Sequence, residues 1–371
     1  MQANQLGVRL VLWAGIVPAP VPQSVLEAIE KLEIERSGDD VGGFQLTLRA
    51  EKTVGVEFDL LRSPQLLVGS RVVIGVLMGV TPEWLLDGVI THRELLPSDK
   101  PGSSRLCLTG RDLSAVMDRM DVVMSYPGCS DSVIAAAILV RYAPYGVVPQ
   151  VSPTVDVPLP TERVPLQHET DLRCLRRLAR DNNYVFFIEP LGFGASRAYF
   201  GPDLRFALPL SPLRVDMGAR SNVDALTFKQ DGDRAEFVEG RAYPPGFPVA
   251  VPIVGLPLPP VPPLAAIPTL PLHYRFDGSL TARSIPRALL AATGAQARAN
   301  HRAVECEGTV DTVRYGSVMQ PRRLVGVQGA GYSFDGYYSV SKVRHELSRH
   351  KYTQKFSLVR EGVGSLTPAV M

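Results

Sequence analysis

Residues Arg322 to Gly364 read RRLVGVQGAGYSFDGYYSVSKVRHELSRHKYTQKFSLVREGVG, a series of short apolar runs separated by glycines and polar clusters. From Tyr352 to Leu358 apolar and polar residues alternate, which is the two-residue period of a strand with one buried face. Glycines bound the upstream runs Leu324–Val327 and Tyr337–Val343, and Glu346–His350 makes a polar turn before the last run. The segment therefore predicts an antiparallel meander. In its last strand we expect Tyr352, Phe356 and Leu358 to point inward and Thr353, Lys355 and Ser357 to point outward.

The N-terminal third of the chain also predicts strands. Leu6–Val17 reads as a first strand, and Glu30–Glu35 pairs with Gly43–Ala50 around a turn at Ser37 to Asp40. Further strands are expected at Arg71–Met78, Trp84–His92 and Arg105–Thr109. Because many short strands leave edges that can aggregate, a closed barrel suits this pattern.

Helix signals occur in three places. Ser130 is an expected N-cap before Asp131–Tyr142, and Thr170 is an expected N-cap of a second helix that ends at Asn182 and Asn183. A third helix is expected over Ser284–Asn300, with Pro286 in its first turn. The inner stripe of the second helix consists of Leu172, Leu175, Leu178 and Ala179.

Two hairpins and two proline-rich segments complete the interpretation. Tyr184–Glu189 and Arg197–Phe200 form a hairpin around Gly192–Gly194, and Val223–Lys229 and Glu236–Tyr243 form another around Asp231–Asp233. Pro144–Pro165 reads as a connector. Pro244–Leu272 is rich in proline and in aliphatic residues, so we expect an extended segment that packs against the body of the protein.

Composition limits the possible classes of protein. With 371 residues, 45% hydrophobic and 20% charged, the chain can form two or three cores, and a net charge of +2 gives no support for a polyanion-binding protein. The cysteines are far apart, which excludes a zinc ribbon and predicts reduced, buried thiols: Cys107, Cys129, Cys174 and Cys306. Leu6–Val17 is too short to span a membrane and is interrupted by Arg9, so we expect no membrane-spanning segment and synthesis in the cytoplasm.

No catalytic, cofactor-binding or metal-binding residues are predicted. The glycines from Gly326 to Gly331 join strand to strand and read as turn glycines, and His168-Glu169 lacks the second histidine of a zinc motif. His345 and His350 read as surface histidines. One helix carries four arginines that could bind an anion or pair with carboxylates, namely Arg173, Arg176, Arg177 and Arg180.

The order of several motifs resembles one known family. GYYSVSKVRH, residues 336–345, followed by KYTQKFSLVREG, residues 351–362, resembles the C-terminal strands of the phage late control protein D family. These are baseplate hub proteins of contractile phage tails and of extracellular contractile injection systems. The polar cap, helix and aromatic strand from Gln167 to Phe186, together with Leu66–Gly69 and Leu86–Thr91, are similar to the same family.

The resemblance implies a mainly β fold with inserted helices (α+β). It implies two tube-protein-like antiparallel β-barrels in one chain plus a small helical and hairpin insertion. Residues 1–115 would form the first barrel, completed by strands in 215–243, and residues 116–214 would form the insertion. Residues 244–283 would be the extended proline-rich segment, and residues 284–364 a helix and the second barrel.

The resemblance also implies a structural, non-enzymatic hub with no cofactor. It would form a homotrimeric ring that joins a sixfold inner tube to a threefold spike, with other baseplate components as further partners and no nucleic-acid contact required. Because no lysozyme-like or needle-like extension follows Gly364, the spike would be a separate protein. After synthesis in the cytoplasm, the protein would be assembled into a tail or injection particle.

Two alternatives remain open at this point. A cell-wall glycan hydrolase of a tail baseplate is one, motivated by acids such as Glu169 and Asp171, because catalytic carboxylates need no local motif. A tail-tube or adaptor protein is the other, although two strand-rich halves exceed the one barrel that a tube subunit needs.

Overall fold

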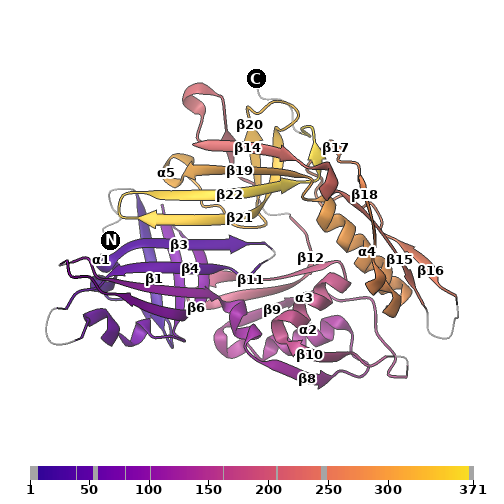
Figure 1. Cartoon of the computed structure of the whole chain (residues 1–371), viewed down its shortest axis with the longest axis horizontal. Helices are drawn as coiled ribbons and strands as arrows, with labels where there is room; N and C mark the ends of the chain where they lie inside the picture. The colour runs from indigo at the N-terminus through magenta and orange to yellow at the C-terminus, as the bar shows by residue number, and fades with distance from the viewer. Residues whose placement is uncertain are drawn as a thin grey trace.

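One large sheet runs through both halves of the chain in the computed structural model (Figure 1). The structure describes residues 7–38, 40–52, 57–79, 81–100, 102–161, 163–205, 208–243 and 249–366. The sheet has thirteen strands in the order β14-β19-β22-β21-β3-β4-β7-β6-β5-β1-β2, with β20 beside β21 and β13 beside β20. Its strands are β1 (Val8–Gly15), β2 (Ala19–Pro20), β3 (Ile29–Ser37), β4 (Gly43–Arg49), β5 (Arg71–Met78), β6 (Pro82–Leu96), β7 (Arg105–Asp112), β13 (Leu210–Arg214), β14 (Ala225–Gln230), β19 (Val304–Asp311), β20 (Leu324–Gln328), β21 (Gly336–Ser348) and β22 (Tyr352–Arg360).

The N-terminal half of the sheet forms a hydrophobic core to which Leu347 and Tyr352 of the C-terminal half also contribute. Alternation along β3 buries Leu32 and Ile34, and alternation along β4 buries Phe44, Leu46 and Leu48. β5 is buried over most of its length. The short helix α1 (Gln23–Ala28) adds Val25 to this core.

The C-terminal half has a second core and joins the first half through β21. Residues Ser339 to Leu347 of β21 pair with β22, and Lys342 to Ser348 pair with β3 on the other side. Figure 1 shows β21 lying between β22 and β3. The two halves of the chain therefore share one sheet, joined through β21. Next to this core lies the short helix α5 (Thr312–Tyr315).

An inserted α/β region contacts β6 of the N-terminal half and lies at the lower centre of Figure 1. Its helices are α2 (Asp131–Val140) and α3 (Asp171–Asp181), and both bury an apolar stripe in a third core. The strands of this region are β8 (Asp121–Ser125), β9 (Val147–Val151), β10 (Leu166–Thr170), β11 (Tyr184–Gly192) and β12 (Ala195–Pro202). β8 pairs with β10, and β12 pairs with both β11 and β9.

A small three-stranded sheet lies on the helix α4 (Ile285–Asn300) and forms a fourth core with it. The sheet consists of β15 (Glu236–Ala242), β16 (Val251–Val254) and β18 (His273–Phe276), with β15 in the middle. β17 (Ile267–Pro268) pairs with β23 (Gly362–Val363). The 3₁₀ turns are η2 (Asp59–Arg62), η3 (Pro64–Leu66), η4 (Leu113–Asp118), η5 (Ala143–Tyr145), η6 (Gly218–Arg220), η7 (Gly232–Arg234) and η8 (Gly278–Ala282).

The predicted fold class, mainly β with inserted helices, is confirmed. The meander is present as β20, β21 and β22, and the two expected N-caps are formed: Ser130 accepts from Val133 N, and Thr170 accepts from Arg173 N. The hairpin around Gly192–Gly194 is also present as β11 and β12.

The second predicted hairpin is wrong. β14 pairs with β19 instead of with its sequence neighbour β15, which lies between β16 and β18 in the separate sheet. The strands in 215–243 therefore do not complete the N-terminal half. The physical reason is burial: β15 gains an apolar partner in α4, whereas β14 extends the C-terminal half beside β19.

Two other expectations need qualification. The proline-rich segment contains an edge strand, β16, and residues 244–248 of it lie outside the described residues. All four cysteines are free, as expected, but Cys107 and Cys129 are only half-buried.

Candidate functional site

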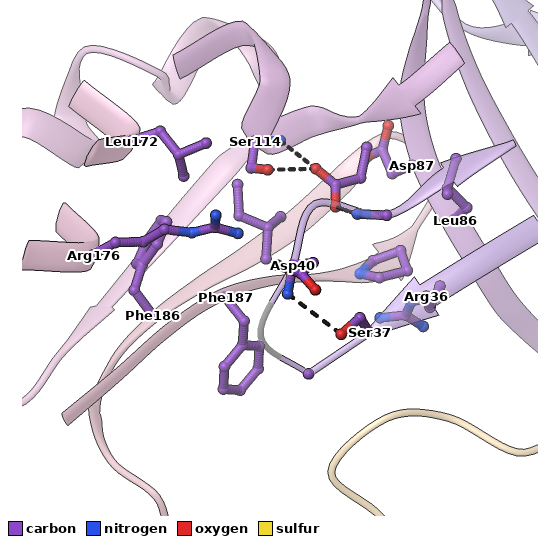
Figure 2. A pocket seen from close by; sticks show the side chains of 15 residues that line it. Arg36, Ser37, Asp40, Leu86, Asp87, Ser114, Leu172, Arg176, Phe186 and Phe187 are labelled. Carbon is purple, nitrogen blue, oxygen red and sulfur yellow. Dashed lines mark hydrogen bonds between the residues drawn. The ribbon is translucent and has the colours of Figure 1, made fainter. Parts of the chain in front are cut away.

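A cavity of about 340 Å³ lies where the end of β3, the β11–β12 hairpin and the start of β20 meet. We call it the arginine cavity, because its lining includes Arg36, Arg197, Arg205, Arg322 and Arg323. The carboxylates in its wall are Glu189 and Asp203, and its apolar members include Phe187 and Leu204. A smaller neighbouring pocket shares Arg36, Ser37 and Phe187 with it (Figure 2).

Arg322 connects the C-terminal half to both other regions at this point. Its backbone has a φ of +67°, which bulky residues adopt only when their surroundings hold them there. The guanidinium donates to Asp203 Oδ1 at 2.9 Å and to the Gly38 carbonyl at 2.6 Å. It also lies 4.8 Å from the centre of the Phe187 ring, a cation–π distance. These contacts fix the orientation of the guanidinium.

Asp203 is the ionised centre of the cavity wall. Burial alone would raise the pKa of this carboxyl, but the Arg205 and Arg322 guanidinium groups lower it to about 2. Arg205 donates to Asp203 Oδ2 at 2.5 Å and to His301 Nε2 at 2.5 Å. Since arginine can only donate, His301 must accept and is therefore neutral, and burial together with Arg205 lowers its pKa well below 6.5.

Arg36 is the unusual member of the lining. It lies on the same face of β3 as Leu32 and Ile34, so the strand directs it inward. Its Nη1 is fully covered, and no hydrogen-bond acceptor among the described residues reaches it. Burial lowers the pKa of this guanidinium, and the charges of Glu189 and Asp112 only partly oppose the shift.

The turn beside Arg36 is held by Asp112. Its carboxylate accepts from Gly42 N at 2.5 Å, from Ser114 N at 3.0 Å and from the Ser114 hydroxyl at 2.5 Å (Figure 2). Burial raises the pKa of Asp112 against these hydrogen bonds. The β3–β4 turn is therefore tied to the end of β7, which makes one wall of the pocket rigid.

The tip of the β11–β12 hairpin docks on the N-terminal half. Phe193, at a φ of +51°, stacks edge-on against Trp13 and Trp84, with ring centroids 5.5 Å and 5.4 Å away, although 72% of its surface is exposed. Below the tip, the buried pair Arg71–Asp87 binds the Gly194 carbonyl and the Ser196 hydroxyl. These contacts hold the β11–β12 hairpin, which lines the arginine cavity, against the N-terminal half.

The residues considered from sequence do not come together into one site. His350 and His168 are exposed, but His345 is fully buried, so its expected surface position is wrong. Glu169 pairs with Arg177 at 2.6 Å, and Asp171 is buried, accepting from Tyr142 Oη at 2.8 Å and Gln167 Nε2 at 2.7 Å. Gly329 and Gly331 lie in the turn after β20, as expected, but Gly326 lies within β20 and pairs with Tyr337.

The arginines of α3 are mostly engaged. Arg177 pairs with Glu169, Arg173 lies 3.7 Å from Asp118, and Arg180 donates to the Arg176 carbonyl. Arg176 extends from α3 toward the small pocket (Figure 2). In the described part of the chain no group of three or more His, Cys, Asp or Glu side chains could hold a metal ion. Within the same ranges no helix has the length and apolarity needed to cross a membrane.

Sequence reasoning missed the arginine cavity. Its members come from residues 36–38, 185–205 and 321–323, and only folding brings them together. One signal was available: a charged residue at position 36 continues the apolar face of Leu32 and Ile34, which is an unusual place for an arginine.

Comparison with known proteins identifies solved structures with a similar fold. No protein-family model and no curated protein sequence matches this chain. The tail protein from Neisseria meningitidis MC58 superimposes with a TM-score of 0.67 at 16% identity, over 96% of this chain and 98% of that one. The 43 kDa tail protein of prophage MuSo2 from Shewanella oneidensis gives 0.62 at 15% identity, over 95% and 98%.

A third solved structure comes from a secretion system. The E. coli c3393 protein, a component of the type VI secretion system with structural similarity to the T4 tail proteins gp27 and gp5, gives a TM-score of 0.56 at 14% identity, over 90% of this chain and 73% of that one. At these identities the likeness shows the fold. This chain has the fold of phage tail proteins and of type VI secretion components.

Proposed function

We propose that the protein is a structural component of a contractile tail or injection machine, the baseplate hub that joins an inner tube to a spike. The observation that carries this proposal is the likeness over nearly the full length of two phage tail proteins. The resemblance of residues 336–345 and 351–362 to the late control protein D family points to the same role.

A homotrimer is the assembly that the architecture favours. Each chain contributes two barrel-like sheet halves side by side, joined through β21 and β3. Three such chains present six comparable units to a sixfold tube while keeping a threefold face for a spike. The partners would then be two further copies, the inner tube protein, the spike protein and other baseplate components, within an assembled particle.

The contacts of Glu169 and Asp171 favour a structural role over glycan hydrolysis. A glycosidase needs two carboxylates facing a shared substrate site. Glu169 is instead paired with Arg177, and the buried Asp171 is surrounded by Arg141, Tyr142 and Gln167.

The mass of the assembly tests the proposal. We expect light scattering of the purified protein mixed with its tube and spike proteins to give three copies of the 40.4 kDa chain per complex. A monomer of the isolated protein in dilute solution is compatible with this, because the partners complete the interface. Six copies per complex, or failure to bind either partner, would overturn it.

A further inference from the structure

We infer that the arginine cavity is a binding site for an oxyanion, namely a carboxylate or phosphate group. The inference is independent of the proposed function, since it follows from the charges and packing of the cavity alone. It concerns a place where the N-terminal half, the inserted region and the C-terminal half meet.

The first argument is the charge balance of the lining. Five arginines face two carboxylates, Glu189 and Asp203. Glu189 is taken by Arg197, and Asp203 is shared by Arg205 and Arg322. Arg36 and Arg323 are therefore left without a carboxylate partner among the described residues, so the cavity carries an excess of positive charge.

The second argument is the covered Nη1 atom of Arg36, whose side chain as a whole is half-buried. A covered guanidinium nitrogen with no acceptor loses its hydration without gaining a replacement, which costs free energy. An apolar side chain would fill the same inward position on β3, as Leu32 and Ile34 do four and two residues earlier. An anion in the cavity would supply the missing acceptor and offset the cost of covering this nitrogen.

The third argument is that the donors are already in place. Arg322 is fixed by Gly38, Asp203 and the Phe187 ring, and Arg205 is fixed by Asp203 and neutral His301. Groups held in position before a ligand arrives lose little conformational freedom when it binds. Arginine guanidinium groups also suit the two or three oxygens of carboxylate and phosphate.

The cavity is large enough to hold a group bigger than a single small ion. About 340 Å³ is within the range of small-ligand sites, and Phe187, Tyr199 and Leu204 give it an apolar wall. The oxyanion can therefore arrive as free phosphate or as the acidic side chain of a partner protein. The chemistry recognised is the same in both cases.

The test measures thermal unfolding and calorimetric binding with two probes, inorganic phosphate and a tetraglutamate peptide, against sodium chloride at equal ionic strength. We expect a saturable rise in Tm with at least one probe and none with chloride. Binding of phosphate identifies a free anion as the source, and binding of the peptide alone identifies an acidic protein segment. No saturable effect from either probe overturns the inference.

Substitutions of the arginines that line the cavity test whether the probe binds there. Arg36→Gln should weaken binding about tenfold or more, because it removes a charged hydrogen-bond donor. Arg9→Gln, on an exposed position of β1, is the matched control and should bind as the parent does. Without probe, Arg36→Gln should unfold at the same temperature as the parent or a higher one. If Arg36→Gln does not fold, Arg323→Gln is used in its place. If the variant that is used binds the probe as tightly as the parent does, the proposed site is wrong.

Discussion

His345 shows how one residue can couple the stability of this protein to pH. The side chain is fully buried between the two sheet halves, with Nδ1 at 2.9 Å from the Tyr352 hydroxyl. Burial, with a smaller contribution from the Arg36 charge, lowers its pKa from 6.5 to about 3. The folded chain therefore keeps this imidazole neutral at pH values where an exposed histidine is charged.

Acid should consequently destabilise the protein through His345. Between about pH 6.5 and pH 3 this histidine is protonated in the unfolded state but neutral in the folded state. The free energy of unfolding therefore falls as pH falls, by at most about 1.4 kcal/mol per pH unit. We expect urea unfolding at pH 7 and pH 5 to differ less in His345→Gln than in the parent. A residual difference from His301, whose pKa is shifted in the same direction, should remain.

A matched control separates this effect from histidine titration in general. His350 is exposed at the turn after β21, so His350→Gln should retain the full pH dependence of the parent. If His345→Gln also retains it, the buried imidazole does not act as described.

At the scale of the element, β22 carries the alternation that the sequence predicts. Phe356 is 4% exposed and packs in the C-terminal core, whereas Lys355 is exposed and pairs with Glu346 at 2.8 Å. Leu358 is buried in the same core and Tyr352 in the core of the N-terminal half, as expected for an inner face. Thr353 is buried as well, because α5 lies against this end of the strand. The alternation of apolar and polar residues thus predicts which face of the strand is buried in the core. It does not predict whether another element covers the opposite face.

Two neighbouring substitutions on β22 should have very different effects. Phe356→Ala leaves a cavity in the core and should cost about 3–5 kcal/mol, a large part of the stability of a domain. Lys355→Ala removes one exposed ion pair and should cost under about 1 kcal/mol. Equal denaturation midpoints in urea for the two variants would contradict the placement of this strand.

The hairpin tip is an element whose fit depends on a glycine. Gly192 has a φ of +106°, and a Cβ at this position would lie 2.3 Å from Trp84 Nε1. Gly192→Ala should therefore lower the unfolding free energy by about 2 kcal/mol or more, through backbone strain and overpacking together. Its tryptophan fluorescence should change, because the tip is displaced from Trp84.

Gly69→Ala is the control for backbone strain alone. Gly69 has a φ of +91°, and nothing lies within 4 Å of an added Cβ. The expected cost is about 1 kcal/mol without a change in fluorescence. The docking of the hairpin is disproved if the two alanine variants behave alike.

At the scale of the whole molecule, sequence reasoning predicted strands and helices better than their partners. β14 and β15 each showed a clear strand pattern, yet β14 pairs with β19, whose residues lie more than seventy positions further along the chain. Nothing local distinguishes that partner from the nearer β15. The arginine cavity escaped prediction for the same reason, since Arg36 and Arg322 meet only after the two halves have joined along β21.

A buried ionic network also joins parts that are distant in sequence. Arg287 of α4 is 3% exposed and lies 3.0 Å from Asp131 of α2 and 2.8 Å from Asp181 of α3. Asn182 completes the network by donating to Asp131 at 2.7 Å. In sequence these residues read as ordinary charges on amphipathic helices, and only the packing of α4 against the insertion gives them their role.

The proline-rich segment is attached to the body chiefly at its C-terminal end. Its Leu264 and Ala265 are buried, and their backbone N–H groups donate to Glu361 Oε1 at 2.6 Å and 3.0 Å. Thr269 N donates to the Glu361 carbonyl at 3.0 Å, and β17 pairs with β23 next to it. Much of the rest is exposed and apolar, including Leu258 and Leu270.

Removing the Glu361 carboxylate should release this segment without unfolding the sheets. Glu361→Ala leaves two buried N–H groups without an acceptor, which costs about 1–3 kcal/mol each, and the cost falls on a segment with few other backbone contacts. We expect proteinase K to cut the variant between residues 249 and 272 several-fold faster than the parent, while the thermal unfolding of the remaining structure changes little. Glu307→Ala, an exposed carboxylate on β19, is the control and should be cut at the parental rate. Equal cleavage of Glu361→Ala and the parent would mean that the segment is held by its apolar contacts alone, and that the exposed prolines and leucines are kept in place without the carboxylate.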